Sequence, residues 1–167
     1  MKVMINTVLL ASLVFLSACG YHLRGSIALP AEMKSMYLFG VSSGLSTELQ
    51  AMLRASDGKV AVAPDQAGIV IKVMKEDMRR RALSIGKTGK SSEVELTYYL
   101  RFQFYDNKDT ALLDEQTIDL SREFFNDQTA VLAKENEELL IRKEMYRQAA
   151  RMIMTRAQIA LEGRNKP

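Results

Sequence analysis

The chain has 167 residues, of which 47% are hydrophobic and 26% charged, a composition typical of one globular domain. A formal net charge of +3 is too small to indicate nucleic-acid binding, and one cysteine excludes an internal disulfide. The single histidine, His22, excludes a metal site built on two histidines and falls in a segment unsuited to a catalytic triad.

Residues 1–18 have the layout of a bacterial signal peptide that ends at a lipidated cysteine. Lys2 supplies a short positive start, and the apolar run that ends at Leu16 is too short to cross a bilayer. Two small residues precede Cys19, as a signal peptidase requires. We expect cleavage before Cys19, which would then carry acyl chains on its sulfur and on its new amino group.

Two other interpretations of this segment remain open. A transmembrane anchor would be followed by charges that stop transfer, and the sequence lacks such a cluster. Plain secretion would leave Cys19 unpaired in an oxidising compartment. Lipidation removes that problem, because several acyl chains, at about 0.8 kcal/mol per buried methylene, anchor a protein durably.

Residues 19–32 have few regularly spaced apolar positions and predict an extended tether from the lipid to the domain. A first strand is predicted over residues 33–39. A helix over residues 42–56 follows, because serines stand at its start and leucines recur at helical spacing. A short second strand is predicted over residues 59–63, before Pro64. This order of elements predicts parallel or mixed pairing.

Three longer segments predict an antiparallel meander. Residues 69–85 alternate at first and lose their phase after Met74, which indicates a β-bulge. Residues 93–105 alternate throughout, with apolar side chains at the even positions. A turn at residues 106–109 leads to residues 115–125, which alternate in the same way. One face of this meander should pack on the core and the other should face water.

From Asn126 to Leu161 the apolar period becomes helical. The positions expected on one buried face are Leu139, Tyr146, Ala150, Ile153, Ala157 and Ala160. The predicted fold class is α+β, a two-layer sandwich in which a mixed, mostly antiparallel sheet of four to five strands carries two helices on one face. With no repeat or linker to divide them, residues 33–163 should form a single domain, and residues 164–167 a short tail.

The candidate ligand contacts are basic. Arg79, Arg80 and Arg81 stand near the end of a long strand, and Lys87 and Lys90 follow in the next loop. Several cations beside an apolar rim suit a phosphorylated lipid or sugar. Basic residues at strand ends also keep edges soluble and prevent pairing with other chains, and the sequence leaves both interpretations open.

No catalytic motif stands out. The loop at residues 86–90 lacks the spacing of a phosphate-binding P-loop, and the only thiol is committed to acylation. The acidic run at residues 135–138 fits a solvated helix face. We therefore expect no enzyme, no cofactor and no metal site, since a hydrolase would need carboxylates that converge in a cleft.

Two specific sequence blocks stand near the ends of the chain. The first is Cys-Gly-Tyr-His-Leu-Arg at residues 19–24, directly after the apolar run. The second combines Phe-Phe-Asn-Asp at residues 124–127, Ala-Lys-Glu-Asn-Glu at residues 133–137 and Lys-Glu-Met-Tyr at residues 143–146. Together they resemble the LptE family of lipopolysaccharide-assembly lipoproteins, and the resemblance extends from Cys19 to the last helix.

The resemblance implies a lipid-anchored protein on the periplasmic face of the outer membrane. Gly20 after the cysteine indicates the same membrane, because lipoproteins kept in the inner membrane commonly carry aspartate there. It implies that the protein plugs the LptD β-barrel and that the pair places lipopolysaccharide in the outer leaflet. It further implies direct lipopolysaccharide binding by one basic residue between the central strands and another early in the last helix. By position these are Lys87, where the family often has arginine, and Lys134.

The resulting hypothesis is that Lys87 and Lys134, assisted by Lys90 and residues 79–81, contact the phosphates of lipid A or the inner core. They would replace the divalent cations that bridge neighbouring lipopolysaccharide molecules. The alternative is a lipid-anchored structural subunit of an envelope assembly complex that binds no lipid ligand.

Overall fold

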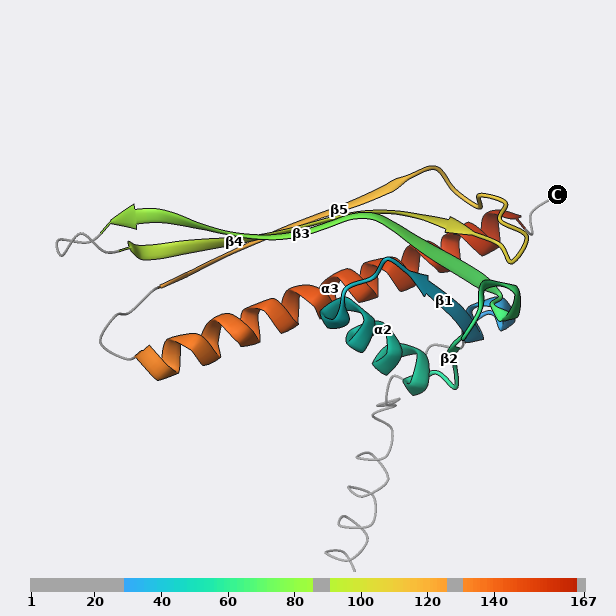
Figure 1. Ribbon diagram of the computed structural model, residues 1–167, viewed down its shortest axis with the longest axis horizontal. Coiled ribbons are helices and arrows are strands. Elements are labelled where there is room, and N and C mark those ends of the chain that lie inside the picture. The colour runs from blue at the N-terminus through green and yellow to red at the C-terminus, as the bar shows by residue number, and fades with distance from the viewer. Residues whose placement is uncertain (1–28, 86–90, 126–130, 165–167) are drawn as a thin grey trace, which may run out of the picture.

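The computed structural model describes residues 29–85, 91–125 and 131–164. Figure 1 shows a long sheet with both helices on one of its faces. The main elements are β1 (Ser35–Phe39), α2 (Ser43–Ala55), β2 (Lys59–Val60), β3 (Ile69–Ile85), β4 (Ser91–Tyr105), β5 (Gln116–Phe125) and α3 (Val131–Arg164).

The described strands form one mixed sheet in the order β2-β1-β3-β4-β5. β1 lies between β2 and β3 and runs parallel to both, while β3, β4 and β5 pair antiparallel. These pairings confirm the predicted α+β class, the parallel pairing at one end and the antiparallel meander. The sequence did not predict that the first strand would lie between the second and the third.

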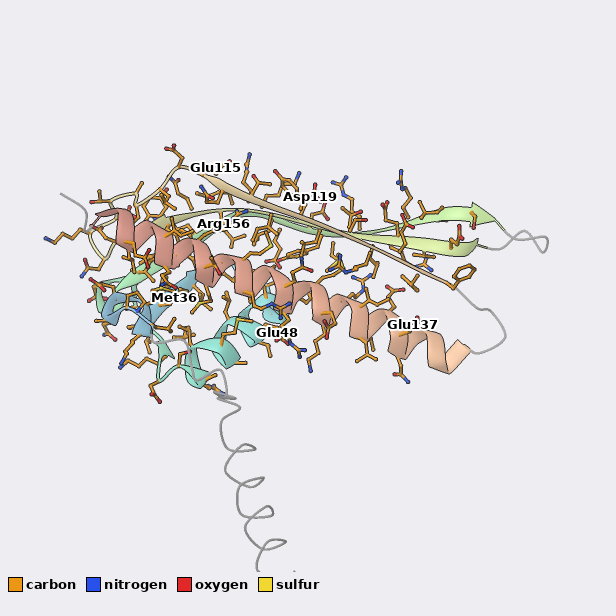
Figure 2. The ribbon with its side chains drawn as sticks, turned by 180° about the vertical axis from the view of Figure 1, so that it is seen from behind. Met36, Glu48, Glu115, Asp119, Glu137 and Arg156 are labelled. Atoms are coloured by element: carbon orange, nitrogen blue, oxygen red, sulfur yellow. The ribbon has the colours of Figure 1, made fainter. Side chains whose placement is uncertain are left out.

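Alternation in β4 separates the two faces of the sheet. Every even-numbered side chain from Val94 to Phe104 is buried toward the helices. The odd-numbered side chains face the other way, and their partners on β3 and β5 include Asp77 and Asp119. Figure 2 shows Asp119 on the side of the sheet away from α3. The predicted division into one core face and one wet face is confirmed.

The β-bulge falls where the sequence loses its phase. The register of β3 against β4 shifts between Val73 and Lys75, so Met74 has no direct partner across the ladder. Because side chains alternate along a strand, one inserted residue exchanges the faces that the following positions occupy. Before the bulge, odd-numbered residues of β3 such as Val73 face the helices. After the bulge, even-numbered residues such as Glu76 face them.

The bounds of β1 and β2 differ from the predicted ranges. Residues 33 and 34 belong to a turn of 3₁₀ helix (Ala31–Lys34) that follows Pro30, so β1 begins only at Ser35. β2 ends at Val60, before a second 3₁₀ turn that starts at Pro64. Both boundaries lie near a proline, whose fixed φ angle favours turns over strand pairing.

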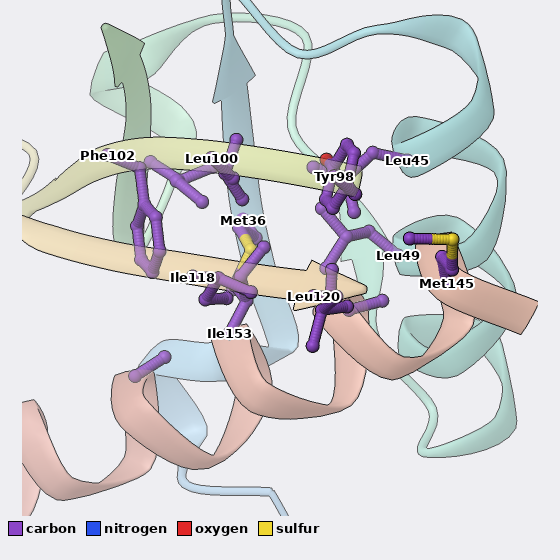
Figure 3. Packing of buried hydrophobic residues seen from close by; sticks show 14 of the residues in the cluster. Met36, Leu45, Leu49, Tyr98, Leu100, Phe102, Ile118, Leu120, Met145 and Ile153 are labelled. Carbon is purple, nitrogen blue, oxygen red and sulfur yellow. The ribbon is translucent and has the colours of Figure 1, made fainter. Parts of the chain in front are cut away.

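The core lies between the meander and the helices. Figure 3 shows Met36 of β1 and Leu100 of β4 close to Ile153 of α3, and all three side chains are fully buried. Ala150, Ala157 and Ala160 are also buried, as predicted, and their small side chains allow α3 to approach its neighbours closely.

One expected core position of α3 is wrong. The side chain of Leu139 is 63% exposed. Figure 1 shows that the first half of α3 extends past α2 and diverges from the strands, so α2 does not cover this part of the helix. The helical period was therefore right, but no element among the described residues buries Leu139.

A polar joint connects the start of α2 to the sheet. The carboxylate of Glu76 accepts hydrogen bonds from the Ser42 hydroxyl at 2.5 Å, the Ser42 backbone N–H at 2.9 Å and the Tyr98 hydroxyl at 2.8 Å. Burial and the nearby Glu76 charge raise the pKa of the Tyr98 phenol, which therefore remains a hydrogen-bond donor. The Tyr98 ring also packs edge-on against Tyr146 of α3, with ring centroids 5.2 Å apart.

Candidate functional site

The three consecutive arginines of β3 do not converge. Arg80 lies opposite the buried Leu96 and so faces the helices, whereas Arg79 and Arg81 lie on the opposite face of the sheet. A run of adjacent charges on a strand is divided in this way by the two-residue period. The run therefore supplies one cation to the helix side and two to the solvent side.

The two solvent-side arginines already have acidic partners. Arg79 contacts Asp77 at 2.6 Å and Arg81 contacts Glu95 at 2.9 Å, and these arginine side chains are 73% and 70% exposed. Exposed pairs of this kind add little stability, because water and salt screen them. They are accessible to a ligand, but their charge is partly neutralised.

These arginines also occupy a sheet edge. β1 ends at Phe39, opposite Lys72, and the rest of β3 pairs only with β4 among the described strands. An uncovered edge invites pairing with another chain, and exposed charges there discourage it. Edge protection thus agrees with the placement of Arg79 and Arg81.

Arg80 meets a carboxylate from the last helix. Its Nε lies 3.2 Å from Oε2 of Glu138, while Oε1 of the same carboxylate accepts hydrogen bonds from Nε and Nη2 of Arg142 at 3.0 and 2.7 Å. The three side chains, here named the Glu138 cluster, are 38%, 20% and 29% exposed for Arg80, Glu138 and Arg142. One carboxylate thus holds two guanidinium groups from different elements.

The Glu138 cluster keeps one net positive charge. Burial alone would raise the pKa of Glu138, but the hydrogen bonds and charge of Arg142, followed by those of Arg80, lower it below its ordinary value. Glu138 is therefore ionised at neutral pH, and it balances only one of the two arginines. A half-buried surplus cation of this kind attracts anions.

The other basic positions predicted from the sequence are placed only in part. Lys87, Lys90 and the lipidation site Cys19 lie outside the described residues. Lys134 belongs to the first turn of α3, although its side chain lies outside the description. Its helix position is one turn before Glu138 and on the same face, because residues four apart lie one above the other.

The sequence interpretation missed Glu138 and Arg142. It assigned residues 135–138 to a solvated helix face, and this holds for Glu137, which is exposed and labelled in Figure 2. Glu138 is instead partly buried against Arg80. The available signal was the four-residue spacing of Glu138 and Arg142, which favours an ion pair on one helix face.

Within residues 29–85, 91–125 and 131–164, no three histidine, cysteine or carboxylate side chains gather where they might hold a metal ion. Over the same ranges, no helix combines the length and the apolar character needed to span a bilayer.

The sequence and the fold both match known proteins. The family model described as LptE, lipopolysaccharide-assembly, matches residues 26–157. The LPS-assembly lipoprotein LptE of Pectobacterium atrosepticum is 29% identical over 153 residues, which cover 89% of this chain and 82% of the relative. The protein of the same name from Photorhabdus laumondii is 28% identical over 157 residues, which cover 92% and 85%.

Two solved structures share the arrangement of helices and strands. An uncharacterized lipoprotein B from Nitrosomonas europaea superposes with a TM-score of 0.67 at 24% identity, covering 83% of this chain and 90% of the other. The rare lipoprotein B from Shewanella oneidensis superposes with a TM-score of 0.59 at 26% identity, covering 77% and 98%. The first likeness, at its low identity, concerns the fold alone.

Proposed function

This chain belongs to the LptE family of lipopolysaccharide-assembly proteins, and from that membership we propose that it is an outer-membrane lipoprotein that binds lipopolysaccharide. In this proposal it also assists the LptD β-barrel in inserting lipopolysaccharide into the outer leaflet. The observation that carries the proposal is the family match over both layers of the fold, from residue 26 to residue 157. The role is one of binding and support and requires no catalytic group.

The proposed anchor is Cys19, exposed by removal of residues 1–18 and acylated at the periplasmic face of the outer membrane. Residues 19–32 would connect the lipid to a body that comprises residues 33–163, with residues 164–167 as a tail. Both relatives described above and the two solved structures carry the word lipoprotein in their names, which supports this arrangement.

The proposed ligand contacts are Lys87, Lys134, Lys90 and the arginines of residues 79–81. Arg80 and Lys134 support the assignment best, because β3 and α3 bring their positions to the same side of the sheet. Lysine and arginine bind phosphate by charge-assisted hydrogen bonds, and arginine offers a planar fork. Cations fixed on the protein would replace the divalent ions that hold neighbouring lipopolysaccharide molecules together.

The proposed barrel contact fits the polarity of the sheet. Large outer-membrane barrels have a polar interior. The sheet face that the helices leave uncovered carries charged side chains such as Lys75, Asp119 and Glu123. A charged sheet face is compatible with a polar barrel interior, because no apolar surface is then left in contact with water.

Charge reversal separates the two proposed roles. We expect the double variant Lys87→Glu and Lys134→Glu to capture less labelled lipopolysaccharide than the unchanged chain, while co-purification with the barrel persists. The matched control is Lys108→Glu, which reverses an exposed lysine in the turn between β4 and β5. Lipopolysaccharide capture that is unaffected by the double variant would show that the assigned contacts are wrong.

A second candidate is a structural subunit of the envelope complex that binds no lipid ligand. The acidic partners of Arg79 and Arg81 favour it, because they already satisfy two of the proposed contacts. It predicts that the unchanged chain co-purifies with the barrel and captures no labelled lipopolysaccharide. The same experiment therefore distinguishes the two candidates.

A further inference from the structure

The Glu138 cluster joins the first half of α3 to β3. Arg80 approaches Glu138 from β3 and Arg142 approaches it from within α3. In Figure 1 this half of α3 extends beyond α2, so among the described elements the strands are the layer beside it. All three side chains are partly exposed, and solvent can therefore reach them.

We propose that the Glu138 cluster is a phosphate-binding site whose resident carboxylate competes with the ligand. A phosphate monoester would displace Glu138 and accept hydrogen bonds from Arg80 and Arg142 together. This inference deepens the proposed function and rests on it, because it names two arginines as ligand contacts and assigns Glu138 as the group that limits affinity.

The chemistry favours exchange of the carboxylate for phosphate. A carboxylate carries one negative charge, whereas a phosphate monoester carries between one and two and offers three acceptor oxygens. Arg142 already donates two N–H groups to one oxygen of Glu138, and Arg80 reaches the other oxygen through Nε. Two guanidiniums directed at one point are therefore present before any ligand arrives.

The neighbouring basic residues of β3 lie apart from this site. Arg79 and Arg81 face the opposite side of the sheet and have their own acidic partners, so they are not part of the Glu138 cluster, although they can contact the ligand elsewhere. The helix position of Lys134 is one turn before Glu138 on the same face. The lowered pKa of Glu138 agrees with a strong positive field from both arginines at its carboxylate.

The test compares binding by four variants of the mature chain. Glu138→Gln removes the competing charge and keeps the shape of the side chain, while Arg80→Gln and Arg142→Gln each remove one guanidinium. The matched control is Glu144→Gln, which removes a carboxylate from the same helix that pairs with Arg147 at 3.2 Å. The probes are purified lipopolysaccharide, the same material after enzymatic dephosphorylation, and inorganic phosphate.

We expect Glu138→Gln to bind lipopolysaccharide about tenfold more tightly, and each arginine variant about tenfold more weakly, as charge-assisted hydrogen bonds to phosphate require. Glu144→Gln should bind like the unchanged chain. Dephosphorylation should remove the differences among variants. Thermal unfolding of each variant verifies that it folds. If Glu138→Gln is unstable, the two arginine variants still test whether the site binds phosphate.

The possible failures are distinguishable. Lipopolysaccharide binding that is equal in all four variants would overturn the phosphate site and leave the proposed function intact. Inorganic phosphate binding that follows the expected order, without lipopolysaccharide binding by the unchanged chain, would support the site and overturn the proposed function. Weaker binding by Glu138→Gln would show that Glu138 positions the arginines and does not compete with the ligand.

Discussion

At the scale of single residues, a close contact between backbone segments constrains the chain just before β3. Gly68, just before β3, packs directly against the 3₁₀ turn, and its N–H donates to the Ser35 carbonyl at 2.8 Å. A Cβ atom at Gly68 would lie 2.1 Å from the Glu32 carbonyl oxygen and 2.7 Å from its carbonyl carbon. Both neighbours are backbone atoms, which cannot rotate away as a side chain can.

We therefore expect Gly68→Ala to lower the free energy of unfolding by about 2 kcal/mol, in the range of overpacked sites. Urea unfolding of the two chains measures the difference. Gly163→Ala is the matched control, because a Cβ there meets no atom within 4 Å, and it should not destabilise the chain. If both variants lost the same free energy of unfolding, the cause would be the alanine substitution itself and not the contact between residue 68 and Glu32.

At the scale of elements, α3 has two parts with different partners. From Met145 to Leu161 its small and apolar residues pack into the core, and several are fully buried. Before Met145, Leu139 and Leu140 are 63% and 64% exposed. In this first part Ile141 is partly buried against the core, and the Arg80–Glu138 ion pair joins the helix to β3. A charged contact thus adds to the limited hydrophobic packing of this part of the helix.

This contact predicts a pH dependence. The pKa of Glu138 is lower in the folded chain than its ordinary value of 4.5, so the folded state holds the carboxylate proton less tightly than the unfolded state does. The stabilisation is present above that ordinary value and is lost as the pH falls through the lowered folded pKa. We expect Glu138→Gln to be less stable than the unchanged chain at pH 7, with the difference disappearing in acid.

Urea unfolding of both chains over a pH series measures this difference. Glu144→Gln, whose carboxylate is 65% exposed, is the control and should show little change. A stability difference between Glu138→Gln and the unchanged chain that is independent of pH would contradict the electrostatic explanation. Lower stability combined with tighter ligand binding would be the usual balance between a stable fold and a functional site.

At the scale of the whole molecule, the helices cover one face of the sheet and leave a charged face open (Figure 1). Membrane attachment in the proposed function therefore depends on the acylated N-terminus. We expect the unchanged chain to fractionate with the outer membrane and Cys19→Ser to appear in the soluble periplasm when the barrel is absent. Fractionation with mass spectrometry of the mature N-terminus measures both outcomes.

Gly20→Asp provides the second arm of that experiment. Aspartate after the lipidated cysteine is a retention signal for the inner membrane, so this variant should remain lipidated and change membranes. An unchanged chain that is found free in the periplasm with an unmodified sulfur would contradict the anchor.

The repeating patterns of the sequence were sufficient for most elements. Strict alternation over residues 93–105 identified β4 and the face that it buries, and the loss of phase after Met74 located the bulge. A helical period identified α3. These predictions succeed because strand and helix geometry impose periods of 2 and 3.6 residues on any chain that buries one face.

Only the tertiary structure decided which residues meet across the fold. Arg80 and Glu138 are 58 positions apart, and neither period relates a residue of β3 to a residue of α3. The insertion of β1 between β2 and β3, and the exposure of Leu139, likewise depend on how the layers are placed. Local periodicity determines what a segment buries, whereas the partner of a buried or charged group depends on packing between segments distant in sequence.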